Sequence, residues 1–222
     1  MLRQLLRETI SNINKPVARA RLRSLVAQTP PPYKVHVGCA FTSLTGWINT
    51  DIGWRAKLWL DVQERWPFPD GSVSHIYADN MIEHVRMPVA RRFFAEASRV
   101  LRPGGRIRLA TPDVESLARL YLEGSPDAQW HLGNARKSGF VANHLVDLLR
   151  IVFQECGHSS GQLWDFASLS AELETAGLAD SRRWTHGQSD DEELRSLEYR
   201  TEEPGHADIE LIIEASKPVS HR

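Results

Sequence analysis

One glycine and several acidic residues of this sequence come directly after short strand-like segments. Gly38 follows the short strand-like segment 34–37, which contains two valines, and Asp51 ends the next short strand-like segment. A glycine lets the backbone turn sharply beside a ligand, and an acid after the following strand can accept hydrogen bonds from two ribose hydroxyls. Residues 34–51 therefore predict a strand, a tight turn and a second strand that together hold a nucleoside cofactor.

The rest of the chain supplies the elements that would position this turn. Strand-like and helix-like segments alternate, which is typical of a parallel α/β sheet with its ligand site at the carboxyl ends of the strands. Further strands are expected at residues 57–62, 73–78, 106–111, 178–186 and 209–216, and helices at 89–101, 114–122, 145–153 and 164–177. We expect the following residues to gather at the strand ends: Gly38, Asp51, Asp61, Asp79 and Asp113.

Composition restricts the class of protein. The chain has 222 residues, of which 41% are hydrophobic and 25% charged, which is ordinary for a globular domain and argues against a disordered or fibrous chain. No apolar run approaches the roughly 20 residues that cross a bilayer, so we expect a cytoplasmic protein. The net charge of -1 does not favour nucleic acid as a partner. Cys39 and Cys156 lack metal-ligand spacing and are expected to be free thiols.

Residues 1–32 are expected to form a basic, amphipathic helical extension before a domain at residues 33–218. Leucines recur at helical spacing among arginines, and Pro16 predicts a break between two helices. The basic face could meet membrane lipid, a protein partner or an acidic substrate. The alternative is an accessory helix that packs its leucines on the domain and leaves its arginines in solvent.

Five short motifs follow one another in the domain. They are GWINTD at residues 46–51, PFPDGS at 67–72, IY at 76–77, EH at 83–84 and RVLRPGG at 99–105. In this combination the chain resembles class I S-adenosylmethionine-dependent methyltransferases over about residues 34–217. The resemblance implies a three-layer Rossmann-like fold, with a mostly parallel twisted sheet and an antiparallel last strand.

The resemblance also implies where S-adenosylmethionine binds. The implied residues are Gly38 beneath the methionine end, Asp51 at the ribose, Asp61 and Val62 at the adenine, and Asp79, Asn80 and Met81 on the sulfonium side. Two features depart from the family. The usual GxGxG turn reads GCAFT, so only its first glycine is present, and too few residues precede Asp51 for a crossover helix. We expect a turn in place of that helix.

Residues 124–161 interrupt the alternation with histidines and amides around one apolar helix, at the position that supplies an acceptor pocket or lid in this fold. A hydroxyl acceptor must lose its proton near the transition state, and Asp113 and His144 are the candidate bases. Asp113 could equally cap the helix that follows it. His84 is expected to be structural, and no histidine pair has a spacing that predicts a metal site.

The chain lacks an NPPY-like tetrad, a catalytic cysteine pair and a metal triad of the catechol type. The resemblance then implies methyl transfer to a small-molecule or glycan acceptor, with a sugar hydroxyl of surface-polysaccharide or secondary metabolism preferred. The alternative is a catalytically weak or inactive methyltransferase-fold module that acts through a protein or membrane partner. A nicotinamide oxidoreductase is disfavoured, because the dinucleotide fingerprint needs three spaced glycines.

Overall fold

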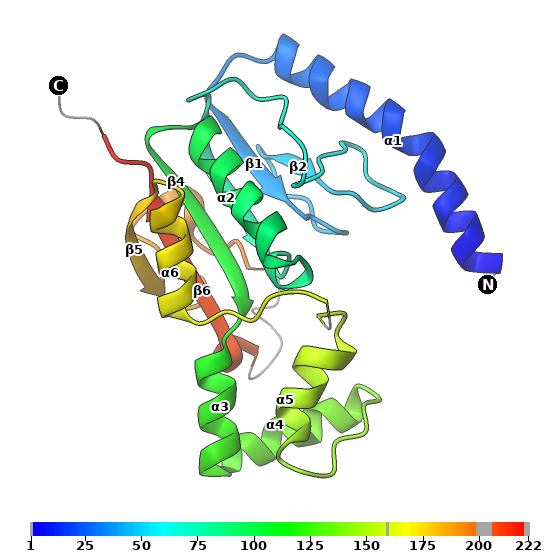
Figure 1. Cartoon of the computed structure of the whole chain (residues 1–222), viewed down its shortest axis with the longest axis vertical. Helices are drawn as coiled ribbons and strands as arrows, with labels where there is room; N and C mark the ends of the chain where they lie inside the picture. The colour runs from blue at the N-terminus through cyan, green and yellow to red at the C-terminus, as the bar shows by residue number, and fades with distance from the viewer. Residues whose placement is uncertain (1, 159, 199–205, 220–222) are drawn as a thin grey trace.

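The computed structural model describes residues 2–158, 160–198 and 206–219. A six-stranded sheet in the order β2-β1-β3-β4-β6-β5 forms its centre (Figure 1). The strands are β1 (Tyr33–Val37), β2 (Ile48–Thr50), β3 (Val73–Asp79), β4 (Leu101–Pro112), β5 (Ala179–Trp184) and β6 (Glu210–Ser216). The first four strands are parallel, and β6 pairs antiparallel with β4 and β5. The expected Rossmann-like fold, with a mostly parallel sheet and an antiparallel last strand, is confirmed.

Helices pack on one face of this sheet. The described α-helices are α1 (Leu2–Gln28), α2 (Met87–Val100), α3 (Val114–Glu123), α4 (Pro126–Lys137), α5 (Asp147–Arg150) and α6 (Phe166–Thr175). Figure 1 shows α2 and α6 lying over the same side of the strands. Helix α2 begins with Pro88 in its first turn and buries Phe93, Phe94 and Ala97 at helical spacing. The hydrophobic core lies between these helices and the sheet.

Loops form the third layer, on the opposite face. Lys34 of β1 pairs with Glu193 at 2.7 Å, and His75 of β3 lies 3.1 Å from Asp191. The Trp47 ring contacts the His75 ring, at 6.3 Å between centroids. The residues between β1 and β2 form turns and no helix, as expected. This face is therefore polar, and residues 187–198 cover it with acidic side chains.

The N-terminal segment is one helix, so the predicted break at Pro16 is wrong. Contacts on both sides of the proline hold the helix together. Before it, Asn14 Nδ2 donates to the Ala56 carbonyl at 2.8 Å, and after it Leu22 and Val26 are buried in the main core. These contacts offset the missing amide hydrogen bond of the proline.

Residues 57–62 do not form the expected strand. Trp59 makes a single bridge to Asp51, and its amide donates to the carbonyl of Ala18 on α1 at 3.3 Å. The Trp59 amide, which could donate to a neighbouring strand, therefore donates to α1 instead. The apolar alternation of this segment instead buries Trp59, Leu60 and Val62.

A small helical lobe follows β4 and lies beyond the carboxyl ends of the strands (Figure 1). Helices α3, α4 and α5 enclose a second hydrophobic cluster, formed by Ala128, Leu132, Ala142, Leu148 and Ile151. The helix expected at 145–153 is present as the short α5, which continues directly into a π-helical turn, Ile151–Glu155. Helix α4 was not expected, because few of its residues are apolar; Ser125 caps it and Pro126 begins it.

Candidate functional site

A cavity of about 350 Å³ lies at the carboxyl ends of β1, β2 and β3. Five of the seven residues implied for the cofactor line it: Gly38, Asp51, Val62, Asn80 and Met81. Apolar side chains from Val37 and Leu60 complete part of its wall. An apolar wall with a carboxylate at its edge fits an adenosine, whose purine is flat and whose ribose carries two hydroxyls.

Gly38 is required by the local backbone and by its neighbour. Its φ is +72°, and a Cβ on it would lie 2.7 Å from Cγ of Met81. Ala40, where the family has its second glycine, also has a positive φ of 45°. A left-handed conformation is unfavourable for alanine. The backbone of the turn therefore has the conformation typical of glycine at a position occupied by alanine.

Asp51 holds this turn in place. Its Oδ2 accepts a hydrogen bond from the Ala40 amide at 2.8 Å, and its Oδ1 accepts one from the Gly53 amide. Each carboxylate oxygen can accept a second hydrogen bond, so these contacts leave capacity for hydroxyl donors. Asp51 thus orders the glycine turn and lies at the cavity.

Asp61 and Asp79 do not line this cavity. Asp61 Oδ1 accepts the amide of Gln63 at 3.0 Å, and its side chain faces a shallow hollow beside α1. Asp79 is buried and accepts hydrogen bonds from the Tyr77 hydroxyl at 3.0 Å and from Asn80 Nδ2 at 2.6 Å. Asp79 therefore orients Asn80, which does line the cavity.

Burial changes the pKa of two groups beneath these strand ends. Burial raises the pKa of the Tyr77 hydroxyl, and the Asp79 carboxylate shifts it in the same direction. Burial lowers the pKa of His36, against the smaller opposing effect of its hydrogen bond with Asn49. Both side chains are therefore neutral at neutral pH, and Tyr77 keeps the proton that it donates to Asp79.

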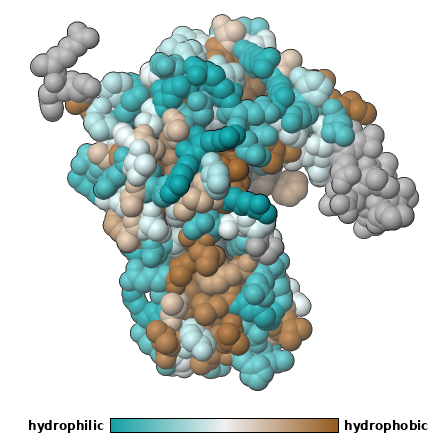
Figure 2. Space-filling model, viewed as in Figure 1, coloured by the Kyte–Doolittle hydropathy of each residue, from teal (hydrophilic) through white to brown (hydrophobic). Residues whose placement is uncertain are grey.

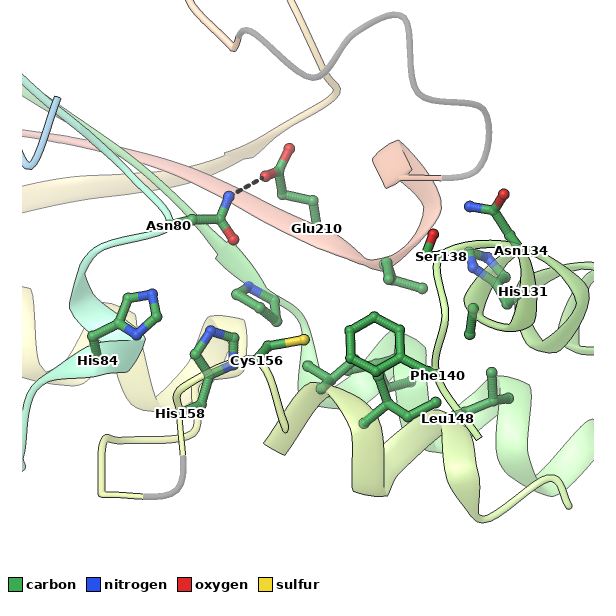
Figure 3. A pocket seen from close by; sticks show the side chains of 16 residues that line it. Asn80, His84, His131, Asn134, Ser138, Phe140, Leu148, Cys156, His158 and Glu210 are labelled. Atoms are coloured by element: carbon green, nitrogen blue, oxygen red, sulfur yellow. Dashed lines mark hydrogen bonds between the residues drawn. The ribbon is translucent and has the colours of Figure 1, made fainter. Parts of the chain in front are cut away.

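A second cavity, of about 410 Å³, lies between the strand ends and the helical lobe. Figure 3 shows the side chains that line it, and Figure 2 shows apolar side chains gathered on the lobe. Its wall combines apolar residues such as Phe140 and Leu148 with polar ones such as Asn134 and His131. The cavity can therefore enclose a molecule with both apolar and hydrogen-bonding groups.

The two cavities share Asn80 and His84. Asn80 has a positive φ of 47°, which asparagine tolerates, and its Nδ2 donates to Glu210 Oε1 at 3.1 Å (Figure 3). This bond joins the end of β3 to the start of β6. A ligand in one cavity would thus lie beside a ligand in the other.

The two candidate bases lie elsewhere. Asp113 is fully buried and caps α3, accepting hydrogen bonds from the Glu115 amide at 3.1 Å and the Ser116 hydroxyl at 2.8 Å. Arg183 also pairs with it at 2.9 Å. His144 is exposed; its backbone amide donates to Asp147 Oδ2 at 2.8 Å, and its carbonyl accepts the Asp147 amide at 2.9 Å. Neither side chain lines either cavity, and of the two alternatives for Asp113 the structure has the cap.

The sequence did not predict that Glu83, His84 and His158 lie close together. Their potential ligand atoms all lie within 4.8 Å of one another, beside the junction of the two cavities. The EH pair after β3 gave a partial signal. Its nearness to His158 depends on a loop far along the chain, so no local spacing could reveal it.

Comparisons with known proteins agree with a methyltransferase. A family model described as a methyltransferase domain matches residues 56–109, which are 54 of the 222 residues. A 37.1 kDa protein in transposon TN4556 of Streptomyces fradiae is 45% identical over 51 residues. That match covers 23% of this chain and 14% of the Streptomyces protein. Residues 56–109 are therefore similar to a methyltransferase domain and lie within a Rossmann-like fold.

Solved structures with a related fold include a SAM-dependent methyltransferase from Thermotoga maritima, with 17% identity and a TM-score of 0.49 over 88% of this chain and 87% of that one. Another is phosphoethanolamine N-methyltransferase 2 of Haemonchus contortus in complex with S-adenosyl-L-methionine. It has 11% identity and a TM-score of 0.47 over 90% of this chain and 52% of that one. Likeness at this level does not bear on what this chain binds. Among the described helices, none is both long and apolar enough to cross a membrane.

Proposed function

We propose that this chain transfers the methyl group of S-adenosylmethionine to a hydroxyl of a small-molecule or glycan acceptor in the cytoplasm. The junction of the two cavities at Asn80 and His84 is the observation that carries the proposal. One cavity has the residues and chemistry for the nucleoside, and the other has room and polar groups for an acceptor. A sugar of surface-polysaccharide or secondary metabolism is the preferred acceptor.

In this proposal the cofactor supplies a methyl group on a positively charged sulfur. Asp51 accepts the ribose hydroxyls, Val62 packs on the purine, and Asn80 and Met81 line the sulfonium side. Much of the catalysis is then alignment of two molecules in a site shielded from water. Because Asp113 and His144 lie outside both cavities, we assign no proton transfer to them.

Calorimetric titration of the purified chain with S-adenosylmethionine, and separately with S-adenosylhomocysteine, tests the cofactor. We expect one-to-one binding of both. Asp51→Asn should weaken binding about tenfold or more, because an amide oxygen accepts hydroxyl hydrogen bonds less strongly than a carboxylate. Asp70→Asn, on an exposed acid far from the cavity, is the control. Absence of binding to the parent chain would overturn the proposal.

The alternative of a non-catalytic module keeps one specific observation in its favour. Helix α1 exposes Ile10, Ile13 and Val17, by 42%, 68% and 46%, on the same helix as several arginines. Such a face could meet a membrane or a protein partner. Sedimentation with anionic lipid vesicles, in a chain that does not bind S-adenosylmethionine, would support this alternative. Binding of the cofactor without sedimentation would exclude a membrane as the partner in this alternative.

A further inference from the structure

Glu83, His84 and His158 form a compact group of three potential metal ligands. Glu83 and His84 lie in the 3₁₀ turn after β3 (Ile82–His84), and His158 lies in the segment after the π-helical turn. Glu83 Oε1 and His158 Nε2 are 3.8 Å apart, and the two imidazole rings have centroids 4.6 Å apart (Figure 3). Two imidazoles and one carboxylate are the ligand set of many catalytic zinc sites.

Close backbone packing holds the two segments together. A Cβ on Gly161 would lie 1.6 Å from the carbonyl oxygen of Glu83, so only glycine fits at this contact. Trp164 Nε1 donates to the Ile82 carbonyl at 3.4 Å. The position of His158 beside the EH pair is therefore built into the packing of the chain.

Neighbouring groups orient two of the three side chains, Glu83 and His84, as they would around an ion. The Thr111 hydroxyl donates to Glu83 Oε2 at 3.1 Å, and Glu83 Oε1 lies 3.8 Å from His158 Nε2. His84 Nδ1 lies 3.4 Å from the Gly157 carbonyl, a contact that favours the tautomer with Nε2 available. Metal-bound histidines usually donate their second N–H to a carbonyl or carboxylate in this way.

Burial and access also fit an ion. The Glu83 and His158 residues are buried, with 2% and 8% exposure, whereas His84 is exposed. Buried carboxylates in proteins are paired with cations or coordinate metals. Ligand atoms of a tetrahedral zinc site lie about 3.3 Å apart, given bonds of about 2.0–2.2 Å. Small side-chain rotations would close the present spacing, and an ion could enter past His84.

We propose that Glu83, His84 and His158 bind one divalent transition-metal ion, with Zn²⁺ as the first candidate. Three protein ligands leave at least one coordination position. Since His84 and His158 line the second cavity, that position faces it. The ion would bind an oxygen of the acceptor and lower the pKa of a hydroxyl there. This second part rests on the proposed function and makes the acceptor an oxygen ligand, such as a hydroxyl or a diol.

Metal binding is measured without the methyl donor, on protein purified without a histidine tag and stripped with a chelator. Zn²⁺ is titrated against a chromophoric chelator, and Co²⁺ binding is followed by visible absorption. We expect one ion per chain and a four-coordinate Co²⁺ spectrum. Failure of the parent chain to bind either ion at micromolar concentration would overturn the proposal and leave Glu83 and His158 as a buried structural contact.

Variants locate the site. Glu83→Gln and His158→Ala should weaken Zn²⁺ binding about 100-fold or more, and Thr111→Val about tenfold through its effect on Glu83. Should the buried variants unfold, His84→Ala tests the same prediction at an exposed position. His144→Ala removes an exposed histidine outside the group and is the control. Equal Zn²⁺ affinity in the parent chain, His84→Ala and His158→Ala would overturn the assignment.

Acetohydroxamate, a bidentate oxygen ligand, tests the open position. We expect it to change the absorption of the Co²⁺-loaded chain. An unchanged spectrum would overturn the role in acceptor binding. Titration of the same preparation with S-adenosylmethionine separates the two proposals. A chain that binds the cofactor but no metal ion contradicts only the metal site. A chain that binds the metal ion but not the cofactor contradicts only methyl transfer.

Discussion

Three residues at the strand ends have left-handed backbone conformations: Gly38, Ala40 and Asn80. All three line the first cavity. Glycine and asparagine adopt this conformation readily, whereas alanine does so at an energetic penalty. Ala40 therefore has a backbone conformation that alanine does not favour. The Asp51 carboxylate stabilises this conformation by accepting a hydrogen bond from the Ala40 amide.

Gly38→Ala should impair both stability and cofactor binding. The left-handed φ should cost about 1–2 kcal/mol of unfolding free energy, and the new methyl group would push Met81 toward the cavity. Urea unfolding and calorimetry with S-adenosylmethionine measure the two effects. Gly71→Ala is a matched control, because its φ is +65° and its nearest neighbour would be 4.0 Å away. Equal cofactor affinity in the two variants would contradict a role for Gly38 at the cavity.

The two thiols should differ in reactivity. Burial raises the pKa of Cys39 to about 11, and Asp51 adds to the shift, whereas Cys156 is exposed. With a raised pKa, Cys39 stays protonated at pH 8, and its thiolate fraction grows about tenfold per pH unit up to pH 10. Titration with a disulfide reagent should show one fast thiol at pH 8, absent in Cys156→Ser. A fast second thiol at pH 8 would refute the shift.

Strand β4 connects the sheet to residues 187–198, the loop that carries acidic side chains. Arg108 of β4 is fully buried and donates to Glu198 at 2.5 Å, to Glu214 of β6 and to the Gln188 carbonyl at 2.9 Å. Burial raises the pKa of Glu214, although Arg108 opposes this shift. The arginine thus holds residues 187–198 on the face of the sheet opposite α2 and α6.

Arg108→Met should lower the unfolding free energy by about 3–5 kcal/mol at pH 7, since two buried carboxylates lose their partner. Without the arginine, nothing at this position opposes the burial that raises the pKa of Glu214 above its unfolded value, so the folded state favours the protonated form of Glu214. The loss should therefore be smaller near pH 4–5 and larger as pH rises. Urea unfolding across this range measures it. Arg106→Met, in a partly exposed pair with Asp190, should cost less than about 1 kcal/mol and is the comparison.

The second half of α1 is part of the main hydrophobic core. Ala18 and Leu22 are buried, with 0% and 1% exposure, and the Ala18 carbonyl accepts the Trp59 amide. The helix extends past the domain toward the N-terminus (Figure 1). One end of α1 thus stabilises the fold, while Ile10 and Ile13 remain exposed on the other part.

Leu22→Ala should lower the unfolding free energy by about 2–5 kcal/mol, because it leaves a cavity in the main core. Arg21→Ala, at an exposed position of the same helix, should change it by less than about 0.5 kcal/mol. Urea unfolding with a single probe of the sheet compares the two variants. Equal stabilities would mean that the helix packs on the domain without contributing to its core.

Sequence patterns predicted most of the strands and helices of the domain in their order, the turn at Gly38, and five residues that line the first cavity. These features depend on local preferences: apolar periodicity, the conformational freedom of glycine, and acids placed after strands. The continuous α1 and the loss of the strand at 57–62 could not be predicted in this way. There, contacts between Trp59 and α1 outweighed local preference.

Which polar side chains contact one another depends on tertiary packing and was not predictable from sequence. Asp61 turned away toward α1, Asp113 became a helix cap, and His158 came to lie beside Glu83 and His84. Each outcome depends on the path of segments far apart in the chain, such as the packing of Gly161 on Glu83. Local sequence fixes a side chain's position along its own element. Its partners depend on how the elements pack, because contacts between distant segments have no sequence period.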